Sequence, residues 1–270
     1  MLFKLGPISF QVNLTKNIYN KYHSYNMEIE KNLYKTKYKT LLNVGGGNFK
    51  HPKWQILDFY STTNNKKNKI DVLYDLNSLK KIPIEDDSVS IIYSSHTIEH
   101  LFKENLDFII SEFYRILDKN HGCLRFVYPD INICFEAYKR EDYDFFYLAS
   151  ELKTIEEKFL KIFAMNAIDS ESGCYLDNGQ IKKILSTKDK ISALNSIEQI
   201  NNSNKSFFRP DYHRSWWNHE ILNDILLKNG FNNVKKSAYG QSEVPILRNT
   251  IYFDSTHPKY SGYTEAFIKV

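Results

Sequence analysis

The chain has 270 residues, 42% of them hydrophobic and 25% charged, a balance that fits a folded domain with its own apolar core. Its net charge of +4 is too small to indicate nucleic-acid binding. The cysteines, Cys123, Cys134 and Cys174, are isolated and form no CxxC pair, so the sequence indicates neither a disulfide framework nor a zinc site.

The hydropathy pattern argues against a membrane protein. No apolar run reaches the roughly 18 residues that a spanning helix needs. The basic Lys4 is not followed by the long apolar stretch of a signal peptide. We expect residues 1–38 to form a helical or irregular lead-in, and the protein to be soluble and cytoplasmic with no membrane span.

Short apolar runs alternate with longer connections through the first half of the chain. The strands that this alternation predicts are Thr40–Val44 and residues 54–58, 70–75, 89–93 and 123–128. Apolar residues recur at helical spacing over residues 104–117, which predicts an amphipathic helix. Such alternation is typical of a parallel sheet with helices on its faces.

Residues 131–208, called the insert below, interrupt this alternation. They are rich in Glu, Lys, Phe and Leu and then in Ser and Asn, so we predict a mostly helical insert with a flexible stretch near residues 195–205. Its role stays open between a cover over the substrate and a contact between two copies in a homodimer.

The α/β pattern resumes after the insert. A helix is predicted over His219–Lys228, ended by Gly230, and strands over residues 231–238 and 263–270. We therefore predict a single α/β domain with a Rossmann-like, mostly parallel sheet of about seven strands flanked by helices. The helical insert follows the fifth strand.

Candidate ligand-binding residues follow four of the predicted strands. Gly45-Gly46-Gly47 follows the first, Asp58 ends the second, Asp75 the third, and Ser94-Ser95-His96 the fourth. In open α/β sheets ligands bind beyond the carboxyl ends of the strands. Glycine lets the backbone approach a ligand closely. A carboxylate at Asp58 can accept both hydroxyls of a ribose, and Asp75 with the neighbouring Leu76 can bond an adenine amino group and cover its face.

A nicotinamide dinucleotide is the competing cofactor. Its loop reads G-x-G-x-x-G, with an acid about 20 residues further on. Here Gly47 is followed by Asn48, Phe49 and Lys50, so the third glycine is missing, and Asp58 comes too early for a full first helix. The N-terminus of that helix is what holds a pyrophosphate. A cofactor without phosphates does not need it, and S-adenosylmethionine has none.

With these residues the chain resembles class I S-adenosylmethionine-dependent methyltransferases. The closest likeness is to small-molecule methyltransferases of surface-polysaccharide gene clusters, for capsule or O-antigen, over roughly residues 40–130 and 207–270. The segments that carry it are Asn43 to Asp58, Asp75-Leu76, Pro83 to Val89, Ile92 to Leu101, Glu112 to Leu117, Gly122 to Asp130, Asp211 to Arg214 and Leu226 to Phe231.

The resemblance implies S-adenosylmethionine as cofactor and S-adenosylhomocysteine as product. Gly45 and Gly47 would face the methionine part, Asp58 the ribose and Asp75 the adenine, while Ser95 and His96 would line the side of methyl transfer. The full set of predicted cofactor residues is Asn43, Gly45, Gly46, Gly47, Asp58, Asp75, Leu76, Ser94, Ser95 and His96.

Methyl transfer from a sulfonium mainly requires alignment, and a hydroxyl acceptor gains further from a general base. The candidate bases are His96, Asp130 and His213, because each follows a predicted strand end or lies in the Arg- and aromatic-rich segment 207–217. Each has a structural alternative. His96 could brace its loop, Asp130 could cap the next helix, and His213 could be a packing histidine.

Arginines in the same segment suit a phosphorylated or nucleotide-linked substrate, since guanidinium binds phosphate with two hydrogen bonds. The candidate substrate residues are Arg209 and Arg214 with the neighbouring Tyr212, and Arg248 is a further arginine outside this segment. The alternative is that these arginines are ordinary surface or salt-bridged side chains. His100, four residues after His96, could form a metal pair with it. No third ligand of suitable spacing is evident, so the sequence predicts no metal site.

We expect S-adenosylmethionine-dependent methylation of a small acceptor, an oxygen of a sugar- or phosphate-containing precursor of a surface polysaccharide. One alternative is a nicotinamide-dependent oxidoreductase on the same sheet plan, which the glycine loop and the missing Tyr-x-x-x-Lys pair disfavour. The other is a non-catalytic, methyltransferase-like subunit, in which the cofactor loop would be degraded.

Overall fold

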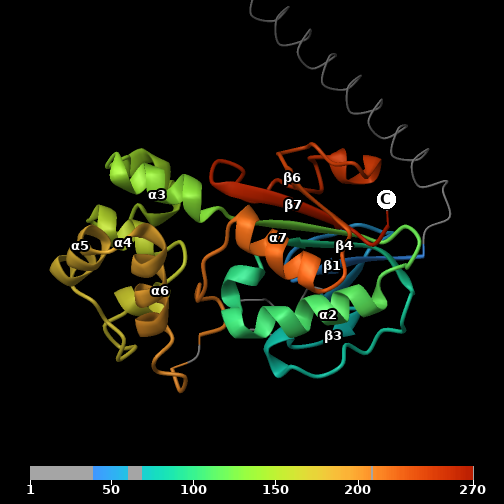
Figure 1. Ribbon diagram of the computed structural model, residues 1–270, viewed down its shortest axis with the longest axis horizontal. Helices are drawn as coiled ribbons and strands as arrows, with labels where there is room; N and C mark the ends of the chain where they lie inside the picture. Colours follow the sequence, from blue (N-terminus) through green and yellow to red (C-terminus); the bar gives the residue numbers. More distant parts are fainter. Residues whose placement is uncertain (1–38, 60–68, 208, 270) are drawn as a thin grey trace, which may run out of the picture.

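A seven-stranded sheet forms the centre of the molecule, in the order β3-β2-β1-β4-β5-β7-β6 (Figure 1). The computed structural model describes residues 39–59, 69–207 and 209–269, so the lead-in predicted over residues 1–38 lies outside the described residues. The strands are β1 (Thr40–Val44), β2 (Gln55–Asp58), β3 (Val72–Leu73), β4 (Val89–Ser95), β5 (Cys123–Pro129), β6 (Asn233–Ser237) and β7 (Ser261–Phe267).

Strands β1 to β5 pair in parallel, and β7 runs antiparallel between β5 and β6. Each strand overlaps a predicted one. The third strand, predicted over residues 70–75, is only two residues long in the structure. One reason is that the Asp71 carboxylate, rather than a strand carbonyl, accepts the N–H of Ile56 at 3.0 Å. The predicted Rossmann-like α/β fold is confirmed.

Side chains on the two faces of the sheet enter different cores, because successive residues of a strand point to opposite sides. On one face Leu42 and Ile92 pack with helices α2 (Leu106–Ile116) and α7 (His219–Lys228). On the other face Leu41 and Ile91 pack against the segment around Phe253, which includes the short helix η6 (Pro245–Arg248). Both α-helices were predicted, and Gly230 takes a φ of +95° just beyond α7.

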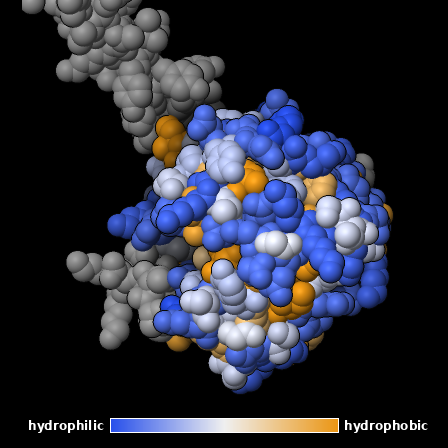
Figure 2. All heavy atoms as spheres, turned by 90° about the vertical axis from the view of Figure 1, so that its left-hand side faces the viewer, coloured by the Kyte–Doolittle hydropathy of each residue, from blue (hydrophilic) through white to orange (hydrophobic). Residues whose placement is uncertain are grey.

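The insert is helical and has its own apolar core, which also takes in Trp216 and Tyr260. Figure 1 shows it to one side of the sheet. Its helices are α3 (Ile131–Lys139), η4 (Tyr143–Ala149), α4 (Ile155–Leu160), η5 (Met165–Ile168), α5 (Asn178–Thr187) and α6 (Lys190–Asn201). Seen from that side, the surface is mostly hydrophilic with smaller hydrophobic areas between (Figure 2).

The flexible stretch predicted near residues 195–205 is wrong for most of its length. Helix α6 continues to Asn201 because its apolar side chains, Leu194 and Ile197, are fully buried in the core of the insert. The Asn201 side chain also accepts a hydrogen bond from the N–H of Ala167 at 3.1 Å. The polar composition of this stretch therefore reflects one exposed helix face.

Three short helices complete the part of the fold that surrounds the site. They are η1 (Leu76–Ser78) after β3, η2 (Ile98–His100) after β4, and η3 (Lys103–Asn105) before α2. Across the described ranges, none of the helices is both long and apolar enough to span a membrane.

Candidate functional site

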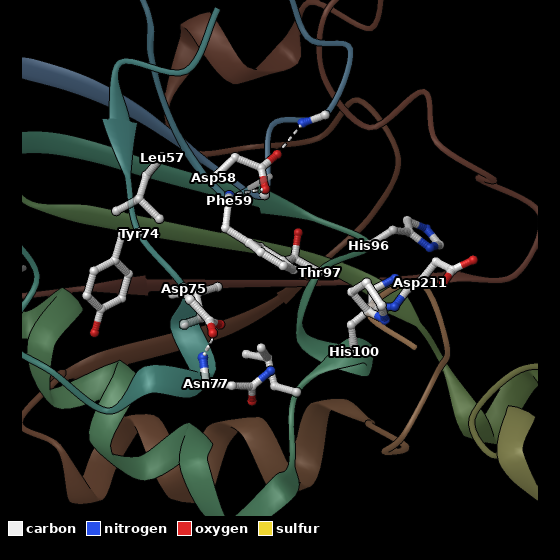
Figure 3. A pocket seen from close by; sticks show the side chains of 15 residues that line it. Leu57, Asp58, Phe59, Tyr74, Asp75, Asn77, His96, Thr97, His100 and Asp211 are labelled. Atoms are coloured by element: carbon white, nitrogen blue, oxygen red, sulfur yellow. Dashed lines mark hydrogen bonds between the residues drawn. The ribbon is translucent and has the colours of Figure 1, made fainter. Parts of the chain in front are cut away.

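A cleft lies at the carboxyl ends of β1, β2 and β4, where parallel sheets bind ligands. We call it the first cleft (Figure 3). Leu57, Asp58 and Phe59 lie on one side of the view, and His96 and His100 on the other. The lining residues are Gly45, Gly47, Leu57, Asp58, Phe59, Tyr74, Asp75, Leu76, Asn77, His96, Thr97, His100, Leu101, Pro210 and Asp211.

The glycine loop is built for close approach. Gly45 has a φ of +67°, and a Cβ on it would lie 2.2 Å from Thr97 Oγ1. Gly47 has a φ of +50°, where a Cβ would meet nothing within 4 Å. No helix intervenes between β1 and β2, a stretch that the structure describes in full. A helix N-terminus for a pyrophosphate is therefore missing at this strand end, as the sequence predicted.

The Asp58 carboxylate joins the glycine loop to the end of β2. Oδ2 accepts the N–H of Gly47 at 2.9 Å and Oδ1 accepts the N–H of Phe59 at 2.8 Å. Each carboxylate oxygen has a second lone pair, so both can still accept a hydroxyl proton from a ligand in the cleft. The side chain fits the predicted role at a ribose.

Asp75 and Leu76 form the neighbouring wall. The Asp75 carboxylate accepts the N–H of Asn77 at 2.9 Å and caps η1, while Leu76 is buried beside it. Together with Leu57 and Phe59 they offer apolar surface next to hydrogen-bond acceptors, which suits a flat base such as adenine. The residues of the first cleft therefore fit a nucleoside without phosphates.

Four of the predicted cofactor residues do not line this cleft. Asn43 is buried within β1, and a Cβ on Gly46 would lie 2.7 Å from the Ile56 side chain. Ser94 and Ser95 end β4 and precede the residues that do line the cleft. Of the residues predicted at the end of β4, His96 lines the cleft, and Thr97 and His100 of the same loop line it as well.

A second cleft adjoins the first, because His96, His100 and Asp211 line both. Residues of the insert form much of its remaining wall. The further lining residues of this second cleft are Phe146, Leu148, Ala149, Lys161, Ile162, Met165, His213, His257 and Tyr260. Apart from His213, no pattern in the sequence pointed to them, since they come from segments with no shared motif.

Backbone contacts hold His213 in the second cleft. The N–H groups of Arg214 and Ser215 donate to the carbonyl of Glu99 at 2.7 and 3.2 Å. The indole of Trp217 donates to the carbonyl of Ile98 at 3.2 Å. The segment that follows the insert is thereby fastened to η2, which brings His213 across from His100.

The three candidate bases differ in their surroundings. His96 has a φ of +50°, and both ring nitrogens have partners, with Nε2 at 2.8 Å from Ser261 Oγ and Nδ1 at 3.2 Å from Glu99. Asp130 lines neither cleft: it caps α3 by accepting the N–H of Asn132 at 2.9 Å, and burial raises its pKa. Burial lowers the pKa of His213 to about 4, so its ring is neutral near pH 7.

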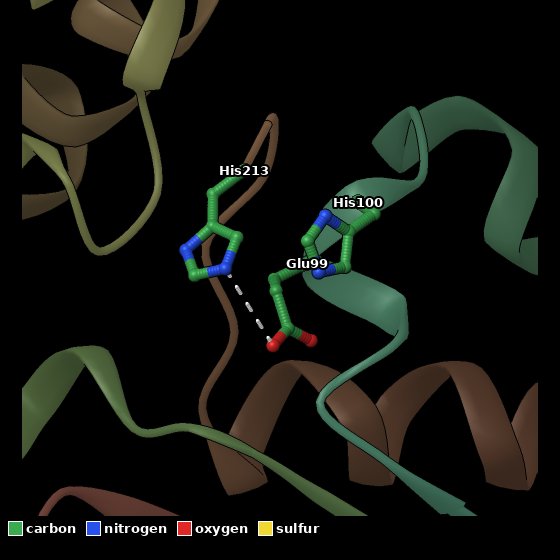
Figure 4. A group of neighbouring side chains, drawn as sticks. All are labelled: Glu99, His100 and His213. Atoms are coloured by element: carbon green, nitrogen blue, oxygen red, sulfur yellow. Dashed lines mark ion pairs between the residues drawn. The ribbon is translucent and has the colours of Figure 1, made fainter. Parts of the chain in front are cut away.

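Glu99, His100 and His213 form a cluster between the two clefts, with one ligand atom from each within 4.8 Å of the others (Figure 4). The Glu99 carboxylate is almost fully buried. Burial alone would raise the pKa of this carboxyl group. The neighbouring imidazoles have the larger combined effect and lower the pKa to about 2. The sequence predicted no metal because His96 and His100 lack a third ligand of suitable spacing. The structure brings Glu99 and His213 beside His100, two side chains that this argument from spacing did not consider.

The predicted substrate residues are engaged outside the clefts. Arg209 pairs with Glu171 at 3.0 Å, and the Tyr212 hydroxyl donates to Asp169 at 2.8 Å. Arg214 is buried, with its guanidinium 5.0 Å from the centre of the Phe102 ring. None of the three lines either cleft, although their chain neighbours do. The fourth arginine, Arg248, donates from Nε to a backbone carbonyl at 2.6 Å and lines neither cleft.

Part of the chain matches a protein family, and the chain as a whole is remotely similar to solved structures. Residues 57–124 match the methyltransferase domain family. A search of curated proteins finds no match. Among solved structures the chain is similar to an S-adenosylmethionine-dependent methyltransferase from Thermotoga maritima, described as a possible histamine N-methyltransferase, with 13% identity, 96% of each chain covered and a TM-score of 0.43. It is also similar to one from Archaeoglobus fulgidus, with 13% identity, 89% of this chain and 93% of that chain covered and a TM-score of 0.41.

The sheet is of the Rossmann-like α/β type, parallel from β1 to β5 and with β7 antiparallel beside β5. The matched domain begins at the end of β2 and covers Asp58, Asp75 and the loop after β4, so it includes much of the first cleft. These findings support an enzyme, a methyltransferase, with S-adenosylmethionine as its cofactor. They do not favour the nicotinamide enzyme or the non-catalytic subunit.

Proposed function

We propose that the protein methylates an oxygen atom of a small acceptor, with the cofactor in the first cleft and the acceptor in the second. One observation carries this proposal: the cleft built from the glycine loop and Asp58 shares His96 and His100 with a second cleft lined by the insert. Two ligands in these clefts would meet at the shared residues. The insert would then act as the cover over the acceptor.

The bound cofactor supplies an activated methyl group on a positively charged sulfur. Bound in the first cleft, the cofactor would give this methyl group to the acceptor oxygen, leaving S-adenosylhomocysteine, while the hydroxyl proton would pass to water or to a nearby base such as His96. The protein aligns the two reactants, an effect worth up to about 7–11 kcal/mol in favourable cases. Gly45, Gly47 and Asp58 hold one reactant, and the walls of the second cleft hold the other.

The second cleft supports a sugar- or phosphate-containing acceptor, such as a precursor of a surface polysaccharide. It combines aromatic rings, Phe146 and Tyr260, with imidazoles and the ammonium group of Lys161. Binding sites commonly pair apolar walls with a few polar groups that fix orientation. The buried free thiols, Cys123, Cys134 and Cys174, support a reducing compartment such as the cytoplasm.

Calorimetry of the purified chain tests the first part of this proposal. We expect S-adenosylhomocysteine to bind and NAD to give no heat. Tight NAD binding without S-adenosylhomocysteine binding would contradict the proposal. A methyl-transfer assay with nucleotide sugars and sugar phosphates as acceptors then tests the substrate class. Transfer to amine or carboxylate acceptors alone would refute an oxygen acceptor of this kind.

A further inference from the structure

Glu99, His100 and His213 meet at the wall that separates the two clefts. Their side chains point toward one another from two segments that are far apart in the sequence (Figure 4). His100 lines both clefts and His213 lines the second. Any ligand held by all three side chains would therefore be next to the proposed acceptor.

The backbone fixes which ring nitrogen of each histidine is free. Nδ1 of His100 is 3.3 Å from the carbonyl of Tyr212, and Nδ1 of His213 is 2.8 Å from the carbonyl of Ile162. A carbonyl oxygen can only accept, so each Nδ1 must carry the proton. A neutral ring then has its lone pair on Nε2. Metal-binding histidines are commonly oriented in this way, by donating their other ring N–H to a backbone carbonyl.

Glu99 adds a buried carboxylate whose ion-pair contacts within the described residues are to imidazoles. Its side chain is 1% exposed, and neither carboxylate oxygen accepts a well-aligned hydrogen bond from a described residue. Its ion-pair contacts are to His96 Nδ1 at 3.2 Å and His213 Nε2 at 4.0 Å, and no lysine or arginine within the described ranges pairs with it. A buried carboxylate is costly unless a cation or several donors offset its charge.

We propose that Glu99, His100 and His213 bind a divalent transition-metal cation, which in turn holds the oxygen of the acceptor. Two imidazole nitrogens and one carboxylate oxygen form a ligand set that suits Zn²⁺, Mn²⁺, Fe²⁺ or Co²⁺. Three protein ligands leave coordination positions open for water or for a substrate oxygen. A cation there would make the proton of a bound hydroxyl easier to remove. This role in catalysis rests on the proposed function, whereas the binding of the metal does not.

Titration with Co²⁺ tests the site directly, because Co²⁺ bound by nitrogen and oxygen ligands absorbs visible light. The experiment uses the full chain after chelator treatment and without any methyl donor. We expect one Co²⁺ per chain with a distinct visible spectrum. Glu99→Gln and His213→Gln should each weaken binding at least about tenfold. His257→Asn is the matched control, because His257 lines the same cleft outside the cluster and asparagine tolerates its φ of +47°.

Each outcome is decisive. If the wild type binds no Co²⁺, or if His257→Asn loses binding as fully as His213→Gln, the metal site is refuted. Because Glu99 is buried, circular dichroism checks that Glu99→Gln is folded; if it is unfolded, His100→Gln and His213→Gln decide the test. Calorimetry with S-adenosylhomocysteine separates the two proposals. A chain that binds this product but does not bind Co²⁺ refutes the metal site alone. A chain that binds Co²⁺ but does not bind the product refutes the proposed function alone.

Discussion

At the scale of single residues, Asp58 makes the contacts that shape the first cleft. Its two oxygens accept the N–H groups of Gly47 and Phe59. The carboxylate therefore fixes the glycine loop and also presents lone pairs to a ligand. Asp58 is buried, and a hydrogen bond is electrostatically stronger inside a protein than in water.

Replacing Asp58 should remove cofactor binding without unfolding the protein. A hydrogen bond to a charged group is worth about 1.5–3 kcal/mol, so Asp58→Ala should weaken S-adenosylhomocysteine binding by at least about tenfold for each ribose bond lost. Calorimetry measures the affinity. Asp71→Asn is a suitable control, because Asp71 precedes β3 outside the cleft and an amide oxygen can still accept the N–H of Ile56. Equal affinities in both variants would show that Asp58 does not contact the ligand.

The glycines of the loop differ in what a side chain would meet. Gly45→Ala places a Cβ against Thr97 as well as in a left-handed conformation, whereas Gly47→Ala meets only the backbone cost. That backbone cost is about 1–2 kcal/mol. We expect Gly45→Ala to lower the free energy of unfolding, measured in urea, by clearly more than Gly47→Ala does. The same loss in both would mean that the contact with Thr97 is relieved cheaply.

At the scale of elements, α2 is tied to the chain before β4 through two of its side chains. The Glu112 carboxylate accepts the N–H of Ile82 at 2.7 Å. Arg115 donates to Glu112 and to the carbonyls of Ile82 and Ile84. The start of β4, and with it the loop that carries the site, is thereby fixed against the helix.

This tie predicts a pH dependence of stability. Arg115 holds the pKa of Glu112 below its ordinary value of 4.5, so the charged form is favoured in the folded state. The stabilisation is present above about pH 4.5 and is lost as the pH falls through the lowered pKa. Glu112→Gln should cost about 1 kcal/mol at pH 7, after screening by solvent, and less at pH 4. Urea unfolding at the two pH values measures the free energy of unfolding of the wild type and of Glu112→Gln. A difference between the two proteins that is larger at pH 4 than at pH 7 would contradict the prediction.

At the scale of the whole molecule, one buried ion network joins the parallel and antiparallel parts of the sheet. Arg125 of β5 is fully buried and pairs with Asp254 at 2.6 Å and with Glu265 of β7 at 2.8 Å. It also donates to the carbonyl of Ala238 at 3.0 Å. The network links segments that are distant in the sequence.

Removing the central arginine should destabilise the whole fold. Arg125→Met would leave two buried carboxylates without their cation, which costs about 3–5 kcal/mol. Arg140→Met, at an exposed position after α3, should change stability by less than about 0.5 kcal/mol. Urea unfolding of both variants makes the comparison. A loss below about 1 kcal/mol for Arg125→Met would mean that water replaces the arginine.

The sequence by itself determined the sheet, helices α2 and α7, the helical character of the insert and the residues along one wall of the first cleft. Apolar runs and helical spacing are local signals, so the strands and α2 and α7 could be predicted from them. Gly45, Gly47, Asp58 and Asp75 could be placed together because the ends of parallel strands meet at one edge. Local composition was misleading where a polar stretch formed the exposed face of a buried helix, as in α6.

Only the tertiary structure decided the second cleft and the cluster of Glu99, His100 and His213. Their contacts join η2 to a segment that follows the whole insert. The spacing of residues along the chain does not predict that two segments so far apart in the sequence pack together. The packing of Trp217 against η2 and the hydrogen bonds to the carbonyl of Glu99 bring the two segments together. Chemistry that depends on neighbours along the chain can be read from the sequence, whereas chemistry that depends on packing appears only in the folded molecule.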